Sequence, residues 1–169
     1  ITLSKALSAN LDFLTGDFDL IHFHGRHAGE RTMERTHIEH GAFSICSRRG
    51  TSSHQHNPFV ILSEHDTTEH FGNCYGMSFV YSGNFECTAE KDQYGQTRLS
   101  MGILSERFNY DLQPNESFLA PEVIMCFSNS GFETLSHKYH NIIRHNICRG
   151  DYKLKRRPIL INNWEATYF

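Results

Sequence analysis

The stretch Tyr75-Gly76-Met77-Ser78-Phe79-Val80-Tyr81-Ser82-Gly83-Asn84-Phe85-Glu86-Cys87-Thr88-Ala89 indicates the fold class more clearly than the rest of the sequence. It contains two runs rich in aromatic and apolar residues, which favour strands. A Ser-Gly-Asn turn signal separates them. Because glycine adopts positive φ at no steric cost, Gly83-Asn84 favours a type I′ or II′ turn. The stretch therefore predicts a β-hairpin within residues 75–91.

Strand signals continue on both sides of this stretch. An alternating or continuous apolar pattern predicts strands at 19–24, 32–39, 42–46, 58–62, 99–104 and 117–127. We expect the strand at 32–39 to be exposed and the strand at 58–62 to be buried on both faces, because all but one of its residues are apolar. Pro121 limits the strand at 117–127 to an edge or a bulge. The spacing of Leu3, Leu7, Leu11 and Leu14 is compatible with a short amphipathic helix in residues 1–16, and a linker is the alternative.

One long helix is predicted at residues 129–150. Ser130-Gly131-Phe132-Glu133 matches a capping box, in which the Ser and Glu side chains satisfy free backbone N–H groups. Gly150 is placed to end the helix in a left-handed conformation. The helix has one apolar face, made of Leu135, Tyr139, Ile142, Ile143 and Ile147.

The pattern changes after this helix. The basic run at residues 153–157 predicts a solvated linker, with a phosphate-binding patch as the alternative. Ile159-Leu160-Ile161 then predicts the start of a strand that is apolar throughout, as the strands of parallel barrels are. The chain begins without Met and stops soon after this apolar segment, so we expect that both ends are cut.

The composition is that of an ordinary globular protein and excludes some partners. The 169 residues are 38% hydrophobic, 12% aromatic and 21% charged, and this length suits one domain, with room for a small appendage. A formal net charge of −3 argues against binding to nucleic acid or to an anionic membrane. No run of about 18 apolar residues is present, and no signal peptide is visible.

The five cysteines indicate a reducing compartment. Their number is odd, and no two of them form a CxxC pair. We expect thiols that are mostly buried, no disulfide framework and a cytoplasmic protein.

Four stretches resemble the family 36 glycoside hydrolases, which are α-galactosidases. The similar segments are 47–59, 75–85, 114–122 and 157–169, and together with their order they extend the resemblance from about residue 20 to the end. The resemblance implies a mainly β fold, a β-supersandwich of the galactose mutarotase type, with one long helix leading into the start of a (β/α)8 barrel. It implies three parts: the sandwich at 1–128, the linking helix at 129–150, and a linker with the first barrel strand at 151–169.

The resemblance also implies a reaction. These enzymes remove terminal α-linked galactose from melibiose, raffinose and related sugars with retention of configuration, which requires two carboxyl groups. In the family both are aspartates on later barrel strands, so no residue of this chain is assigned a catalytic role. We therefore expect a non-catalytic part of an α-galactosidase, with galactose-containing oligosaccharides and further copies of the same chain as partners, and no cofactor. A stand-alone carbohydrate-binding β-sandwich is the alternative.

Trp164 is the one candidate substrate-binding residue. It follows an apolar strand-like run, and side chains at the carboxyl ends of barrel strands face the active site. Its flat ring could there contact a sugar, although a lone Trp can also be ordinary core. In the segment 25–31, His27 stands where the family usually has a Trp, which weakens the resemblance there. We expect the neighbouring charged residues to form surface ion pairs; these are Glu30, Arg31, Glu34 and Arg35.

The histidines raise the question of a metal site. His54 and His56 would share one face of a strand and could chelate Zn²⁺ or Ni²⁺ with help from His22 and His24. The preferred interpretation is a hydrogen-bonded turn near Pro58, in which the two histidines and Asn57 satisfy backbone groups. Because the family is not known as metal-dependent, the resemblance implies no metal, and a metal-binding jelly roll is the least supported alternative.

Overall fold

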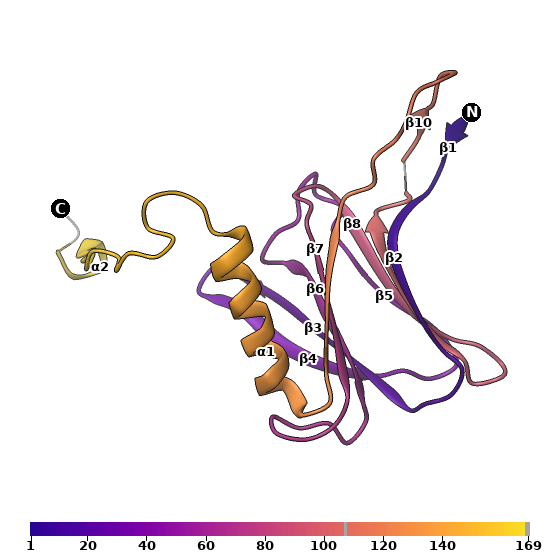
Figure 1. Ribbon diagram of the computed structural model, residues 1–169, viewed down its shortest axis with the longest axis horizontal. Helices are drawn as coiled ribbons and strands as arrows, with labels where there is room; N and C mark the ends of the chain where they lie inside the picture. The colour runs from indigo at the N-terminus through magenta and orange to yellow at the C-terminus, as the bar shows by residue number, and fades with distance from the viewer. Residues whose placement is uncertain (107, 168–169) are drawn as a thin grey trace. The chain divides into compact units, whose positions relative to one another are not determined.

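The computed structural model describes residues 1–106 and 108–167, and the chain divides into two compact units, Ile1–Leu135 and Ser136–Phe169. Strands make up most of the first unit (Figure 1). The boundary between the units lies within helix α1 (Gly131–Ile142). Among the described residues, no helix is both long and apolar enough to span a lipid bilayer.

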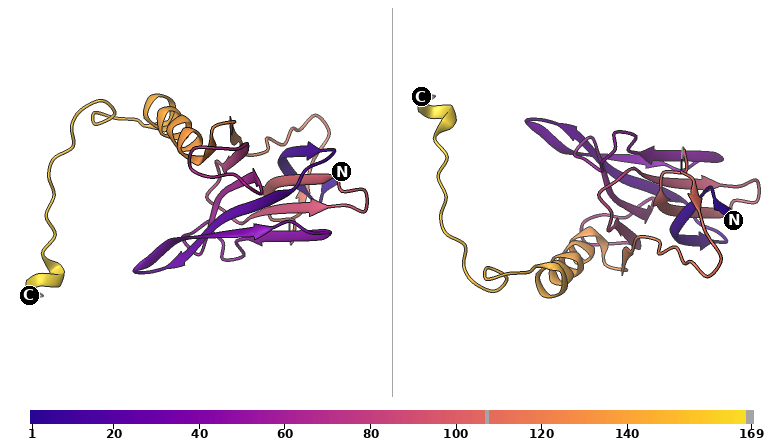
Figure 2. Two further views of the ribbon diagram at one scale, coloured as in Figure 1. Left: turned by 90° about the horizontal axis from the view of Figure 1, so that it is seen from below. Right: turned by 90° about the horizontal axis from the view of Figure 1, so that it is seen from above.

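Two antiparallel sheets form the first unit (Figures 1 and 2). The five-stranded sheet has the order β11 (Val123–Ser128), β7 (Cys74–Phe79), β6 (His56–Glu64), β3 (Phe18–Arg26), β4 (Gly29–His37). The four-stranded sheet has the order β2 (Ala6–Phe13), β9 (Thr97–Ile103), β8 (Phe85–Lys91), β5 (Gly41–Cys46). Two short strands, β1 (Thr2–Leu3) and β10 (Tyr110–Asp111), pair with each other. The predicted mainly β, sandwich-like fold is confirmed.

A single apolar cluster joins the two sheets. In β8, alternate residues Phe85, Cys87 and Ala89 are fully buried, as expected when one face of a strand meets the core. Cys87 lies opposite Met101 and Ala89 lies opposite Leu99 on β9. The five-stranded sheet contributes Leu20, Val60, Leu62 and Met77 to the same cluster. Residues 60–63 of β6 are all buried, which confirms the strand predicted to be covered on both faces.

The predicted hairpin at residues 75–91 is wrong. Both strands exist, but β7 pairs with β6 and β11, whereas β8 pairs with β5 and β9. Residues 80–84 therefore cross from one sheet to the other. Gly83 does not have positive φ, and its lack of a side chain makes room for the Tyr81 ring, which would lie 2.6 Å from a Cβ at this position. A turn signal fixes where a strand ends but does not fix which strand it pairs with.

β8 forms a hairpin with β9, the strand that follows it, and this hairpin was not predicted. Asp92 Oδ1 accepts hydrogen bonds from the backbone N–H groups of Tyr94 and Gln96, both at 2.9 Å. Gly95 has φ +81°, a conformation that glycine adopts at no steric cost. The Asp-x-x-Gly spacing could have identified this turn.

The possible helix in residues 1–16 is also wrong, because this segment forms β2. Ala9, Leu11 and Phe13 alternate toward the core, and Leu11 pairs with Leu99. A spacing of four residues fits one face of a strand as well as one face of a helix, since four is a multiple of two. A bulge between Leu7 and Ala9 interrupts the alternation, which hides the strand pattern in the sequence.

The edge strand predicted at 117–127 is shorter than expected. Only β11, Val123–Ser128, is paired, and it lies at the edge of its sheet. Pro121, which has no N–H to donate, lies in the irregular segment before it.

The predicted helix exists as α1 followed by one π-helical turn, η1 (Ile143–Ile147), but its capping differs from the prediction. Ser130 N–H donates to Ser128 Oγ, and Ser130 Oγ donates to Asn129, so no capping box forms. The first helical N–H groups, those of residues 131–133, instead donate to carbonyls of residues 68–72 at 3.0–3.1 Å. A Cβ on Gly131 would lie 2.4 Å from the Thr68 carbonyl oxygen, so this approach requires glycine.

The end of the helix also falls earlier than predicted. Cys148 N–H donates to Ile143 O at 2.8 Å and closes the π turn. Gly150 has φ +80° as expected, but it lies in the following turn, where its carbonyl accepts from Lys153 N–H at 3.2 Å.

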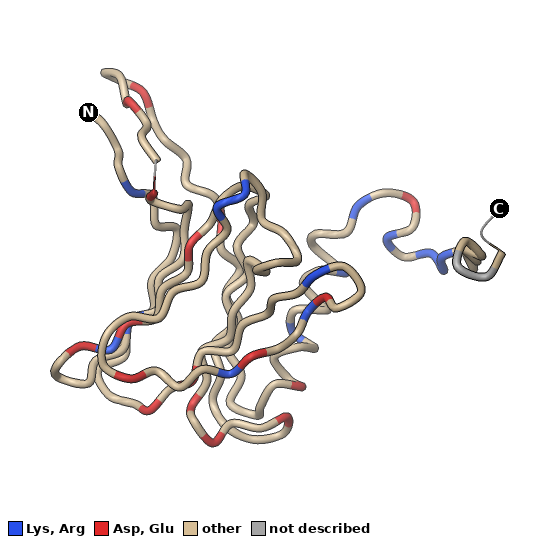
Figure 3. Tube along the Cα trace, turned by 180° about the vertical axis from the view of Figure 1, so that it is seen from behind, with Lys and Arg blue, Asp and Glu red and all other residues tan. Residues whose placement is uncertain are grey.

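The predicted barrel strand at Ile159–Ile161 is not formed. These three residues have no strand pairing, and their exposed fractions are 93%, 91% and 83%. A parallel strand is stable only between partners, and none of residues 1–106 and 108–167 pairs with it. A single helical turn, α2 (Trp164–Thr167), follows. The basic run at 153–157 is exposed along its length, as a solvated linker requires (Figure 3).

Candidate functional site

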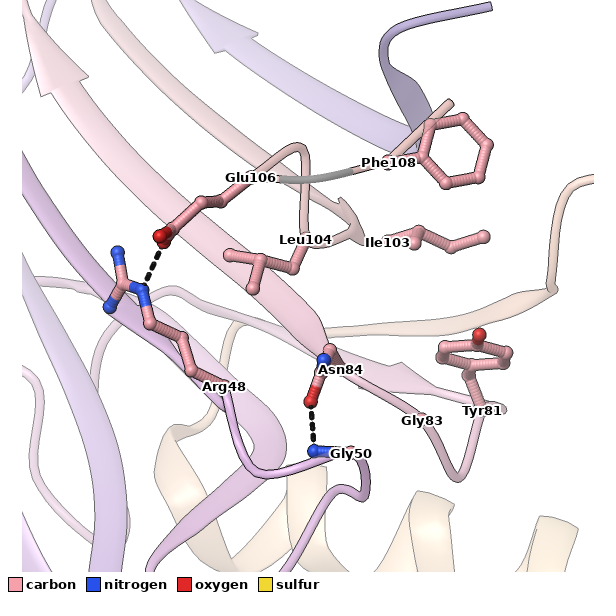
Figure 4. Close-up of a pocket in the computed structure, with 9 residues that line it drawn as sticks. All are labelled: Arg48, Gly50, Tyr81, Gly83, Asn84, Ile103, Leu104, Glu106 and Phe108. Atoms are coloured by element: carbon pink, nitrogen blue, oxygen red, sulfur yellow. Dashed lines mark hydrogen bonds and ion pairs between the residues drawn. The ribbon is translucent and has the colours of Figure 1, made fainter. Parts of the chain in front are cut away.

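A hollow lies at one end of the four-stranded sheet of the first unit (Figure 4). It has a volume of about 450 Å³. Its described lining residues come from three parts of the chain, at 48–50, at 81–84, and at 103–106 with Phe108. We call it the Arg48–Tyr81 pocket; its lining residues are Arg48, Gly50, Tyr81, Gly83, Asn84, Ile103, Leu104, Glu106 and Phe108.

Hydrogen bonds between two of the recognised sequence stretches build this pocket. Gly50 N–H donates to Asn84 Oδ1 at 2.6 Å, and Ser52 N–H donates to Ser82 O at 2.8 Å. Ser47 is buried and its hydroxyl donates to Thr51 O at 2.5 Å. The stretches 47–59 and 75–85 thus hold each other in place, which gives them a structural role.

The side chains of the pocket are suited to binding a ligand and not to hydrolysing one. Arg48 Nε donates to Glu106, and this bond raises the pKa of the guanidinium further above its usual value. Glu106 is the one carboxylate among the described lining residues, whereas a retaining glycosidase needs two. Tyr81, 37% exposed, presents the aromatic ring that a sugar-binding surface would use. The arrangement could hold a polar ligand but could not hydrolyse a glycoside by the two-carboxylate route.

Trp164, predicted to contact substrate, lies in the second unit on α2. Its side chain is 54% exposed, and its backbone N–H donates to Asn162 Oδ1 at 3.0 Å. It therefore sits at a helical turn that Asn162 caps, and not at the end of a formed strand. Its role in substrate binding stays a prediction. The last two residues of the segment, Tyr168 and Phe169, lie outside the described residues.

His54 and His56 do not share a strand face. His54 lies in a turn, and His56 is the first residue of β6. The turn near Pro58, which was preferred to a metal site, is thus present. Within it, Gln55 N–H donates to Ser53 Oγ at 3.3 Å. His56 Nδ1 and Asn57 Oδ1 are buried without a hydrogen-bond partner in the described part of the chain, so these two atoms do not make the expected bonds.

His22 and His24 on β3 are paired with Glu34 on β4. His24 Nε2 lies 2.8 Å from one carboxylate oxygen and His22 Nε2 lies 3.6 Å from the other. Burial lowers the pKa of His22, and Glu34 opposes this effect. Glu34 thus forms an ion pair at the surface as predicted, whereas the partner of Arg35 is the buried Asp19. Glu34 and Arg35 do not pair with each other, because successive residues of a strand point to opposite faces.

Arg35 belongs to a network of hydrogen bonds around Asp19 that the sequence pattern did not predict. Asp19 is 2% exposed and accepts hydrogen bonds from Arg35 Nε at 2.5 Å, His37 Nδ1 at 2.9 Å and His65 Nδ1 at 3.0 Å. Arg35 also donates to the carbonyls of Glu64, His65 and Thr67. The network ties the loop after β6 to β3 and β4.

The electrostatics of the network favour an ionised Asp19. Burial alone would raise its pKa, but the hydrogen bonds from His65, His37 and Arg35 outweigh burial and hold the pKa of Asp19 below its usual value. The hydrogen bond between His65 and Asp19 also raises the pKa of His65. Only the strand register brings these residues together, since Asp19 pairs with His37 on one side and with Ser63 on the other. An acidic residue inside an apolar strand was the available signal.

Family models match both parts of the chain. The glycosyl hydrolase family 36 N-terminal domain matches residues 1–113, and the melibiase family matches residues 117–169.

Curated relatives match over the whole length of this chain. The bifunctional alpha-galactosidase/sucrose kinase AgaSK of Mediterraneibacter gnavus is 56% identical over 169 residues, which cover 100% of this chain and 18% of that protein. Alpha-galactosidase AgaA of Geobacillus stearothermophilus is 49% identical over 169 residues, covering 100% of this chain and 23% of AgaA. The chain thus spans about a fifth of the length of these relatives.

Solved structures share the fold. The galactosidase domain of AgaSK aligns with a TM-score of 0.94 at 56% identity, covering 99% of this chain and 23% of that one. The crystal structure of AgaA in complex with raffinose aligns with a TM-score of 0.94 at 49% identity and the same coverage.

Proposed function

The chain belongs to glycosyl hydrolase family 36, and on this premise we propose that it is a non-catalytic part of an α-galactosidase. In this proposal the complete enzyme removes terminal α-linked galactose from melibiose- and raffinose-type oligosaccharides with retention of configuration. The chain supplies the sandwich that supports the catalytic barrel and the segment that leads into it.

One observation carries the proposal. Two α-galactosidases are 56% and 49% identical to this chain over its 169 residues, and the AgaSK and AgaA folds align with it at a TM-score of 0.94. The site chemistry agrees, because the Arg48–Tyr81 pocket offers a single carboxylate among its described lining residues.

The division of labour along the chain is part of the proposal. Residues 1–128 act as the supporting sandwich, 129–150 as the linking helix, and 151–169 as the linker and first barrel strand. The exposure of Ile159–Ile161 supports this division, because a contiguous apolar segment of this kind is normally covered by neighbouring structure. Trp164 is the residue that we propose to contact the sugar once the barrel is complete.

The proposed setting follows from the same argument. The substrate partners are galactose-containing oligosaccharides, and the AgaA structures with raffinose and stachyose support this class. We propose a homo-oligomer, which the apolar segment Ile159–Ile161 would favour. The five cysteines, which are thiols in the described residues, support a cytoplasmic location.

Hydrolysis of a nitrophenyl α-galactoside tests the catalytic part of the proposal. We expect the purified 169-residue chain to release no nitrophenol above a mock-purified control, with AgaA as the positive control. Turnover that co-purifies with the chain would contradict a non-catalytic role.

Titration with galactose tests the alternative, a carbohydrate-binding module. We expect no saturable heat. Saturable binding that is lost in Tyr81→Ala and kept in Tyr94→Ala, a tyrosine exposed on the β8–β9 turn, would favour the module instead.

A further inference from the structure

Three potential metal ligands meet at one end of the five-stranded sheet. Asp17 directly precedes β3, His37 ends β4, and His65 directly follows β6. Because β3 lies between β4 and β6 and runs antiparallel to both, the start of β3 lies beside the ends of its two neighbours. One ligand atom from each of the three side chains lies within 4.8 Å of the other two. The Asp17 carboxylate is 3.5 Å from His37 Nε2.

A buried carboxylate orients both imidazoles. Asp19 lies 2.9 Å from His37 Nδ1 and 3.0 Å from His65 Nδ1. Asp19 also accepts a hydrogen bond from the Arg35 guanidinium, which has donors only, and the two imidazoles turn their Nδ1 atoms toward the same carboxylate. With Nδ1 engaged by Asp19, Nε2 is the ring nitrogen that remains to bind a metal, and in His37 this atom faces the Asp17 carboxylate. A carboxylate bound to the far nitrogen of a ligating histidine is the usual outer-shell partner in protein metal sites.

We propose that Asp17, His37 and His65 bind a divalent transition-metal ion of the Zn²⁺ class, a site separate from galactoside chemistry. Two imidazole nitrogens and one carboxylate oxygen suit zinc, with water as a fourth ligand. Tetrahedral ligands about 2.0–2.1 Å from the metal lie about 3.3 Å from one another. The ligand atoms, which lie within 4.8 Å of one another, must therefore move closer together when a metal binds. The three side chains are 39–64% exposed, which leaves them room for this movement. A bound ion would link the ends of the three adjacent strands β3, β4 and β6.

Two cationic side chains lie beside the proposed metal position. Lys91 Nζ lies 3.6 Å from the Asp17 carboxylate, and Arg35 is held by Asp19. A metal must displace Lys91 from Asp17, whereas Arg35 can remain in place. Lys91→Met keeps the apolar stem and removes the charge, so the proposal predicts tighter metal binding in this variant.

Calorimetric titration of the untagged chain with Zn²⁺ is the test, with Co²⁺ absorption as a second readout. The proposal predicts one saturable site, at least about tenfold weaker in His65→Ala, since even outer-shell changes cost 10–100-fold in affinity. His70→Ala is the matched control: His70 lies on the same loop, is exposed, and pairs with the Glu133 carboxylate at 3.0 Å outside the cluster. We expect this control to bind like the parent chain.

A second variant keeps the test decisive if His65→Ala fails to fold. Asp17→Asn removes the anionic ligand from a side chain that is 60% exposed and should weaken binding at unchanged circular dichroism. Absence of a saturable site, or equal weakening in His70→Ala, would overturn the proposal and leave an ion-pair cluster only.

Discussion

Replacement of Asp19 by alanine should destabilise the sandwich through the loop that Asp19 holds. Asp19 is 3% exposed at its side chain and fixes the Arg35 guanidinium at 2.5 Å. Arg35 in turn donates to the carbonyls of Glu64, His65 and Thr67. The substitution therefore releases Arg35 as well as the two imidazoles, and the loop after β6 loses its anchor.

The expected magnitude comes mainly from the Arg35 bond. A hydrogen bond between charged groups contributes about 1.5–3 kcal/mol, and truncation of one partner of a fully buried pair costs about 3–5 kcal/mol. Because the Arg35 side chain is 34% exposed, water can partly replace the hydrogen bond that Arg35 loses. We therefore expect a loss of about 2.5 kcal/mol, most of it from this single pair. With a urea m-value of about 2 kcal/mol/M, the unfolding midpoint falls by about 1.2 M.

Urea unfolding followed by circular dichroism measures this change, and Asp12→Ala is the matched control. Asp12 also accepts from an arginine Nε, that of Arg98, at 2.6 Å, but the Asp12 and Arg98 side chains are 57% and 62% exposed. An exposed pair of this kind contributes little, so its midpoint should stay within experimental scatter. Equal midpoints for Asp19→Ala and Asp12→Ala would refute the reasoning, because burial would then make no difference.

Two further predictions concern packing and thiol chemistry. Gly102→Ala should cost about 2 kcal/mol in unfolding free energy, because the new Cβ would lie 2.4 Å from the Ala6 carbonyl oxygen on β2. Gly29→Ala should be tolerated, because the nearest atom to its Cβ would lie 3.6 Å away. Equal losses of stability for the two variants in a calorimetric melting scan would count against this packing. Burial raises the pKa of the Cys87 thiol, so iodoacetamide at neutral pH should label the partly exposed thiols of Cys46, Cys126 and Cys148 and leave Cys87 unmodified until urea is added. Early labelling of Cys87 on a peptide map would show that the core opens more easily than inferred.

Local signals predicted where strands lie, but not how they pair. The apolar run at 58–62 identified β6 because a strand covered on both faces needs no alternation. The turn signal at Gly83 was assigned to a hairpin, although only the three-dimensional arrangement decides whether a chain folds back or crosses between sheets. The strand at Ile159–Ile161 could not be judged from its composition, because a parallel strand depends on partners elsewhere in the chain.

In the candidate sites too, the sequence indicated single stretches but not the contacts between them. The stretches 47–59 and 75–85 could be recognised separately, but the hydrogen bond from Gly50 N–H to Asn84 Oδ1 that joins them at one pocket could not. Asp19 and His65 are 46 residues apart, and only the register of β3 against its neighbours brings them together.

A chimera tests the central claim most directly. In it, this chain replaces the aligned 23% of AgaA from Geobacillus stearothermophilus, to which it is 49% identical. If the chain is the supporting sandwich and lead-in segment of an α-galactosidase, the chimera should hydrolyse nitrophenyl α-galactoside at a rate within about tenfold of AgaA, since a misplacement of about 1 Å costs about a hundredfold. A chimera that is folded and soluble but inactive would contradict the account.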